Sequence, residues 1–169
     1  GKITITGVDT THFTPKQILN LDVSHIPEDR HKYGMVGAMS VEENLILVSY
    51  DRKLFSLHNF LNWKWIAGHS KSICDLFKVK TPTIKEKAIN LSGGNQQKFV
   101  VGRELDRTPN LLVAVHPSRG LDIGATKYIQ SQIMGQRDRG TAVLMVSTEL
   151  DELIELSDRI MVMFEGKIM

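Results

Sequence analysis

The chain has 169 residues, of which 41% are hydrophobic and 24% charged, so its composition predicts one ordinary globular unit. A formal net charge of +2 lacks the basic excess of a nucleic-acid-binding domain. A single cysteine, Cys74, excludes an internal disulfide and is typical of a buried, inert thiol in a reducing compartment. The sequence has no apolar run near the ~20 residues of a membrane-spanning helix and no signal-peptide pattern, so we expect any membrane role to depend on a partner.

The N-terminal part of the chain predicts short elements. Residues 1–8 alternate apolar and polar side chains as a strand does, and the capping-box pattern of residues 14–17 predicts a short helix. A strand over 23–26 then leads into the polar turn 27–30. A local acid–base pair and a functional role both remain open for the last two residues of this turn, Asp29 and Arg30.

The region 37–109 is expected to be entirely helical. Residues 40–43 form a second capping box, and a longer helix is expected over 59–78, with residues 68–70 as its doubtful middle. The two histidines of this region lack the spacing of a metal site: His58 and His69.

The stretch 91–98, Leu-Ser-Gly-Gly-Asn-Gln-Gln-Lys, leads into an apolar-periodic segment, 99–105, which predicts a helix. Gly93 and Gly94 leave their backbone N–H groups accessible, and a helix start carries partial positive charge. The turn therefore suits an anion such as a phosphate, with the Ser92 hydroxyl beside it. The alternative is that Ser92 is an ordinary helix N-cap.

The C-terminal part alternates strands and helices, which favours an α/β fold with a mostly parallel sheet. The expected elements are buried strands over 111–115 and 142–147, helices over 123–139 and 151–156, and a hairpin over 159–169.

The stretch 91–98 resembles the signature motif of ATP-binding cassette (ABC) ATPases, whose pattern is L-S-G-G-x-Q. It is most similar to the C-terminal cassette of the double-cassette ATPases that energise simple-sugar and nucleoside importers, and the resemblance covers essentially the whole chain. It implies an incomplete P-loop NTPase (RecA-like) α/β core over 1–36 and 110–169. An inserted helical subdomain over 37–109 then carries the signature.

In this family, the signature of one cassette faces the nucleotide held by the P-loop of another. The resemblance therefore implies that four signature residues contact ATP in trans: Ser92, Gly93, Gly94 and Gln96. It also implies that three residues from other loops lie near nucleotide: Glu28 at the Q-loop position, Asp122 in the D-loop, and Thr148 where most members have the switch histidine.

Two replacements bear on catalysis. Val115 stands where the family has the Walker B aspartate, and His116 stands where it has the catalytic glutamate. A valine cannot hold a hydrated cation, so the resemblance implies a degenerate site, with His116 as the remaining candidate to orient a water and with no metal ligand. The P-loop pattern G-x-x-x-x-G-K-[ST] does not occur in residues 1–169, so we expect the chain to be truncated before residue 1.

The resemblance implies an importer subunit, cytoplasmic and peripheral on the inner face of the cell membrane. Its expected partners are a second cassette and transmembrane permease subunits, with ATP and Mg²⁺ bound through the partner cassette; neither nucleic acid nor a direct membrane span is expected. The alternative is a non-catalytic truncated cassette that acts as an interaction or regulatory module. An ABC ATPase acting on DNA or ribosomes is disfavoured by the near-neutral charge.

Overall fold

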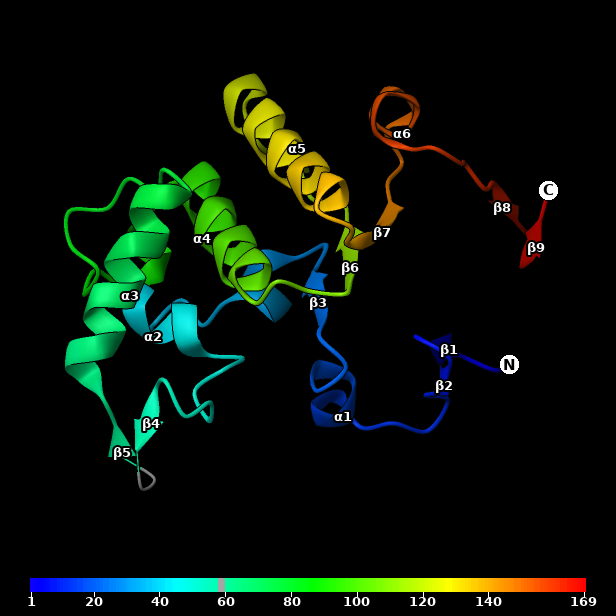
Figure 1. Cartoon of the computed structure of the whole chain (residues 1–169). Coiled ribbons are helices and arrows are strands. Elements are labelled where there is room, and N and C mark those ends of the chain that lie inside the picture. The colour runs from blue at the N-terminus through cyan, green and yellow to red at the C-terminus, as the bar shows by residue number, and fades with distance from the viewer. Residues whose placement is uncertain (58–59) are drawn as a thin grey trace.

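The computed structural model describes residues 1–57 and 60–169, and Figure 1 shows how their elements are arranged. His58 and the predicted helix start at residue 59 lie outside the described residues. The α-helices are α1 (Pro15–Leu19), α2 (Val41–Ile46), α3 (Trp63–Leu76), α4 (Gly93–Asp106), α5 (Ile123–Asp138) and α6 (Leu150–Leu156). The strands are β1 (Thr4–Ile5), β2 (Val8–Asp9), β3 (Val23–Ile26), β4 (Ser56–Leu57), β5 (Phe60–Leu61), β6 (Leu111–Val115), β7 (Ala142–Val146), β8 (Met163–Phe164) and β9 (Lys167–Ile168). A π-helical turn covers Arg30–Gly34 and a 3₁₀ turn covers Ala88–Asn90.

The central sheet has the strand order β3-β6-β7, and both strand pairs are parallel. Ala114 of β6 pairs with Ile26 of β3 on one side and with Met145 of β7 on the other. Paired residues of parallel strands point to the same face, so these residues and Leu112 define one face of the sheet. Leu112, Ala114 and Ile26 are fully buried on this face. The predicted α/β fold with a parallel sheet is confirmed.

Helix α4 is the centre of the core and lies between this sheet and α3 (Figure 1). Phe99, Val100 and Val101 have no exposed surface, and Leu105 is 2% exposed, so α4 is buried on nearly all sides. This burial holds the helix start, where the predicted anion-binding turn lies, in a fixed position relative to the sheet.

The C-terminal half of α4 is fixed by a buried ion pair. Arg103 Nε lies 2.9 Å from Glu104 Oε1, and both side chains are 4% exposed. Arg103 Nη1 also donates to the Asn44 carbonyl oxygen of α2, while the His25 N–H of β3 donates to Glu104 Oε2 at 3.4 Å. A buried ion pair needs such additional hydrogen bonds to offset its desolvation. The pair therefore joins α4 to both the helical region and the sheet.

Both predicted capping boxes are present. Thr14 Oγ1 accepts from the Gln17 N–H, and the Gln17 side chain accepts in return from the Thr14 N–H. Ser40 and Glu43 make the same reciprocal pair at the start of α2. The two boxes start α1 at Pro15 and α2 at residue 41, as the sequence pattern predicts.

The region 37–109 departs from its prediction in two ways. It is not entirely helical, because β4 and β5 form an antiparallel hairpin. The buried Phe55 side chain, which belongs to one cluster with Ile46 and Ile66, holds this segment against the helices. Helix α3 is also continuous through residues 68–70, because Ser70 lies on the same buried face as Ile66. Packing of that face outweighs the weak helix propensity of a central glycine.

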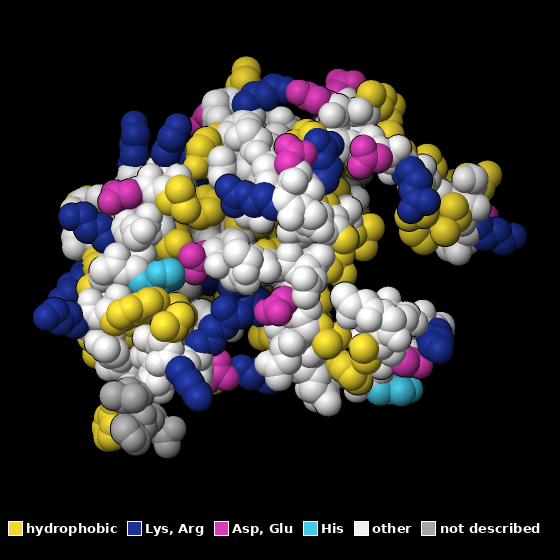
Figure 2. All heavy atoms as spheres, viewed as in Figure 1, with side chains coloured by type: hydrophobic (Ala, Val, Ile, Leu, Met, Phe, Trp, Pro, Cys, Tyr) yellow, Lys and Arg dark blue, Asp and Glu magenta, His cyan; other side chains and the backbone are white. Residues whose placement is uncertain are grey.

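Strand β7 was predicted to be buried, and on one face this is wrong. Leu144 and Val146 are 47% and 46% exposed. The C-terminal hairpin is exposed as well, since Met163 and Phe164 of β8 are both more than half exposed. Figure 2 shows hydrophobic side chains gathered at that end of the molecule. Within residues 1–57 and 60–169, no helix is both long and apolar enough to cross a bilayer.

Candidate functional site

The start of α4 lies within the predicted anion-binding turn. Ser92 precedes the helix with an extended backbone (φ −61°, ψ 152°) and an exposed side chain. Within the described part of the chain, its hydroxyl makes no cap bond to an α4 N–H, and it accepts instead from Asn95 Nδ2 at 3.0 Å. The N–H groups of Gly93 and Gly94 likewise have no acceptor among the described residues. The first turn of α4 therefore presents backbone donors that are available to an anion.

A cation lies against this helix start. Arg30 Nε donates to Gln96 Oε1 at 3.4 Å, and Arg30 Nη2 lies 2.7 Å from the point that a Cβ on Gly93 would occupy. The guanidinium adds a full positive charge to the partial charge of the helix start. Sequence reasoning left Arg30 undecided, because the two segments are about 60 residues apart and only the fold brings them together. Asp29 caps the Arg30–Gly34 turn by accepting from the His31 N–H at 2.9 Å.

Two glutamine side chains in the second half of the signature, those of Gln96 and Gln97, point inward. Gln96 is 3% exposed, and its Nε2 donates to the Ala88 carbonyl oxygen at 3.1 Å. Gln97 is equally buried and donates to the Pro117 carbonyl oxygen at 2.7 Å. Of the four predicted ATP-contacting residues, Gln96 is thus the one whose side chain is buried within the chain. Its amide holds the loop before α4 and supports the Arg30 guanidinium.

Asp122 lies next to the signature. Its Oδ1 accepts from the Ala125 N–H at 2.8 Å and so caps α5. Its Oδ2 is 3.9 Å from the position that a Cβ on Gly94 would occupy. Ser92 and Asp122 are both exposed, so the signature and the D-loop position form one continuous outer surface.

The remaining predicted residues lie at the carboxyl edge of the sheet. Val115 ends β6, and the next residue, His116, donates its N–H to the Val146 carbonyl oxygen at 2.8 Å. His116 has φ +46°, a left-handed conformation that is uncommon outside glycine. Glu28, after β3, is exposed and bonds to Arg119, and Thr148, after β7, is exposed. The fold thus gathers Glu28, His116 and Thr148 at one edge, where parallel-sheet proteins bind ligands.

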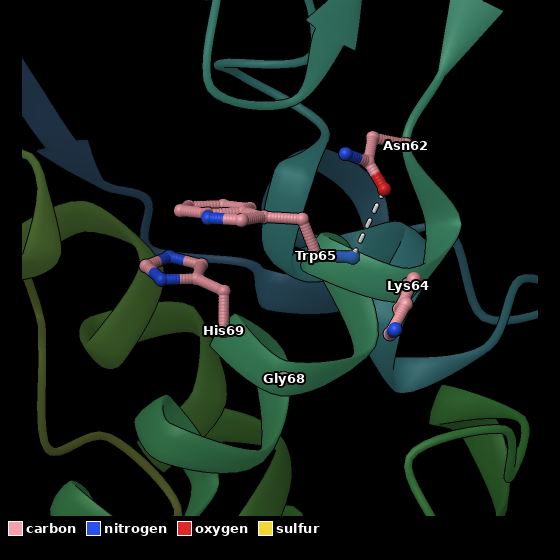
Figure 3. Close-up of a pocket in the computed structure, with 5 residues that line it drawn as sticks. All are labelled: Asn62, Lys64, Trp65, Gly68 and His69. Atoms are coloured by element: carbon pink, nitrogen blue, oxygen red, sulfur yellow. Dashed lines mark hydrogen bonds between the residues drawn. The ribbon is translucent and has the colours of Figure 1, made fainter.

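A separate groove lies at the other end of α4. It has a volume of about 530 Å³ and is lined by Asn62, Lys64, Trp65, Gly68 and His69. Figure 3 shows the Trp65 and His69 rings side by side, stacked with 4.8 Å between their centroids. His69 Nε2 lies 3.0 Å from Asp106 Oδ2, at the last residue of α4. Among the residues that the structure describes, no group of three or more His, Cys, Asp or Glu side chains is placed to hold a metal ion.

In sequence, the chain is similar to known import ATP-binding proteins. No family model matches the chain. It is 44% identical over 168 residues to the guanosine import ATP-binding protein NupO of Bacillus subtilis and 38% identical to the xylose import ATP-binding protein XylG of Thermoanaerobacter pseudethanolicus. Each match covers 99% of this chain but only 33% of the relative, so the chain spans about one third of these relatives' length.

Solved structures show the same fold. A dimeric, post-hydrolysis structure of the ATP-binding cassette MJ0796, bound to ADP and Pi, superposes with a TM-score of 0.79 at 16% identity and covers 99% of this chain and 71% of that one. A nucleotide-free cassette from an ABC transporter gives a TM-score of 0.76 at 23% identity, covering 99% of this chain and 67% of that one. By sequence, the whole chain is therefore homologous to a segment that makes up about one third of the length of sugar and nucleoside import ATP-binding proteins. By structure, it has the fold of an ABC cassette.

Proposed function

We propose that this chain supplies its signature to an ATP site shared with a second cassette of a sugar or nucleoside importer. One observation carries the proposal: the start of α4 presents available N–H donors and the Ser92 hydroxyl on an outer surface, next to the Arg30 guanidinium. These groups fit a phosphate chain, because backbone N–H groups and arginine both bind phosphate oxygens.

The same surface favours a ligand that arrives on another molecule. Gly93 carries no side chain, and the Arg30 guanidinium lies where a side chain at this position would begin. Asp122 adds a carboxylate at the rim that a partner's backbone or basic side chain can meet. We infer that a second cassette brings ATP and Mg²⁺ to this surface, and that the chain alone binds ATP weakly.

We further propose that the chain's own nucleotide position does not hydrolyse ATP. The Val115 side chain offers no oxygen ligand to Mg²⁺. His116 donates its backbone N–H to Val146, while its side chain remains the one candidate to orient a water. The names of the relatives support a sugar or nucleoside as cargo. In this proposal, the chain works with permease subunits on the cytoplasmic face of the membrane.

Replacing Gly93 tests the proposal. Gly93→Glu places a carboxylate at the phosphate position, so we expect ATP-dependent association with a P-loop-bearing cassette of the same importer to be lost, as measured by analytical ultracentrifugation. The fold should tolerate the change, because the atom in the way is the end of the flexible Arg30 side chain. Gly68→Glu is the matched control, since it adds the same charge on an exposed helix face and should leave association intact.

Two results would count against the proposal. If Gly93→Glu pairs normally with the ATP-loaded cassette, the signature does not contact nucleotide in trans. If the unmodified chain pairs equally well with and without ATP, the chain acts instead as a nucleotide-independent interaction module.

A further inference from the structure

Glu152, on α6, is a buried carboxylate with three hydrogen-bond donors. It is 6% exposed, and it accepts from Ser147 Oγ at 2.7 Å, from Gln130 Nε2 at 3.3 Å and from Ser118 Oγ. Within the described residues, no lysine, arginine or histidine makes a salt bridge to it. Neutral side chains therefore satisfy this buried carboxylate, and losing a donor would leave it under-satisfied.

The three donors come from three different segments. Ser118 lies in the loop after β6, Ser147 follows the last residue of β7, and Gln130 lies in the middle of α5. The loop after β6 runs from His116 to Asp122, and the loop after β7 contains Thr148, so both loops carry predicted site residues. One carboxylate thus spans the two loops at the carboxyl edge of the sheet.

The loop after β6 is also joined to the signature helix and to the turn after β3. Gln97 of α4 donates to the Pro117 carbonyl oxygen at 2.7 Å, and Arg119 bonds to Glu28. Besides the bond from the His116 N–H to the Val146 carbonyl oxygen, Glu152 consequently ties the loop after β7 to the segment that contacts the signature helix.

We propose that Glu152 is a positioning residue that holds the loops after β6 and β7 as one unit. Its functional consequence rests on the proposed function. Holding Ser118 in place also holds Asp122, four residues later in the same loop. The D-loop position then keeps its place beside the signature on the surface that meets the second cassette. The alternative is a purely local role, in which Glu152 stabilises only its own short helix.

Hydrogen–deuterium exchange on the chain itself separates these alternatives. Three N–H groups report on the loops: Arg119 and Leu121 donate to the carbonyl oxygens of His116 and Ser118, and Glu149 donates to Ser147 Oγ. In Glu152→Ala we expect exchange in both loops to rise by about ten- to a hundredfold, the range expected for losing a hydrogen bond to a charged group. Exchange within α4 should stay unchanged.

Two variants serve as controls. Glu152→Gln keeps the size and most of the hydrogen bonds, so it should restore near-normal exchange. Glu155→Ala removes a carboxylate from the same helix, where it makes an exposed ion pair with Lys127 at 2.8 Å, and should leave both loops unaffected. Equal loosening in Glu155→Ala, or an unchanged loop after β6 in Glu152→Ala, would overturn the proposal.

A second exchange experiment does not require the Glu152→Ala variant to fold. Ser147→Ala leaves Glu152 in place but removes one donor, and we expect it to raise exchange at Leu121, on the other loop. Unchanged exchange at Leu121 would refute coupling through Glu152. Association with an ATP-loaded cassette is measured in parallel: if the unmodified chain fails to associate, the proposed function fails, whereas the exchange result still decides the role of Glu152.

Discussion

The helical region and the outer face of the sheet differ in how completely each is buried by the chain itself. Around α2, α3 and α4 the apolar side chains interlock, and Ile66, Phe99 and Val101 have no exposed surface. On the sheet, Leu112 is equally buried, whereas Leu144 on the opposite face is about half exposed. A parallel sheet normally has both faces covered. Substitutions in the helical region should therefore affect folding, and those on the outer face should affect it far less.

Two leucines on adjacent strands should show the largest difference in how much a substitution lowers the free energy of unfolding. Leu112→Ala removes a fully buried side chain from the core face, so we expect it to lower the free energy of unfolding by about 2–5 kcal/mol. Leu144→Ala, on the exposed face, should cost only about 1 kcal/mol, because about half of the Leu144 surface stays in water on folding. Urea denaturation followed by circular dichroism measures both. Similar losses for the two variants would show that the outer face is covered in solution.

Two helix glycines give the next contrast. A Cβ on Gly102 of α4 would lie 3.0 Å from the Phe77 ring and 3.1 Å from Ile73 Cγ2, so Gly102→Val should destabilise the chain by about 1–3 kcal/mol through overpacking. On Gly68 of α3, a Cβ would meet no described atom within 4 Å. Gly68→Ala should therefore stabilise the chain by about 0.5–1 kcal/mol, because alanine favours helix. Thermal unfolding tests the sign, and a stabilising Gly102→Val would contradict the close packing of α3 on α4.

The buried thiol of the helical region predicts a loss of stability at alkaline pH. Burial, with a smaller contribution from the nearby Asp75 carboxylate, raises the pKa of Cys74 from 9.0 to about 11. Since the folded-state pKa is the higher one, the stabilisation is complete below pH 9 and is lost as the pH rises from about 9 to 11. At pH 10 we expect a loss on the order of 1 kcal/mol that Cys74→Ser abolishes. Urea titrations at pH 8 and 10 provide the measurement; an equal pH dependence in the serine variant would assign the loss to other groups.

Local sequence patterns predicted the elements whose signals lie within a few residues. The capping box at residues 14–17 and the glycine that follows α5 set element ends that the structure reproduces, and the signature stretch located the start of α4. The exposed face of β7 was missed, because a run of apolar residues looks the same whether one face or both faces are covered.

The parts of the site that sequence did not predict depend on contacts across long separations. Arg30 reaches Gly93, and Glu152 reaches Ser118, only because the fold brings their segments together. No periodicity or spacing encodes such a pairing. The inward direction of Gln96 follows from its hydrogen bond to the loop before α4, which the motif alone could not show.

The last prediction compares two serines that precede helices. Ser40 caps α2, since its hydroxyl accepts from the Glu43 N–H, whereas Ser92 makes no cap bond to α4 within the described residues. Ser40→Ala should therefore cost about 1 kcal/mol, the usual effect of losing an N-cap, while Ser92→Ala should change stability by no more than about 0.3 kcal/mol. Chemical denaturation of both variants measures the difference. If Ser92→Ala is as destabilising as Ser40→Ala, the hydroxyl serves the helix as an ordinary cap. If it is neutral for stability but weakens ATP-dependent association with a second cassette, the hydroxyl is kept available for a ligand outside the chain.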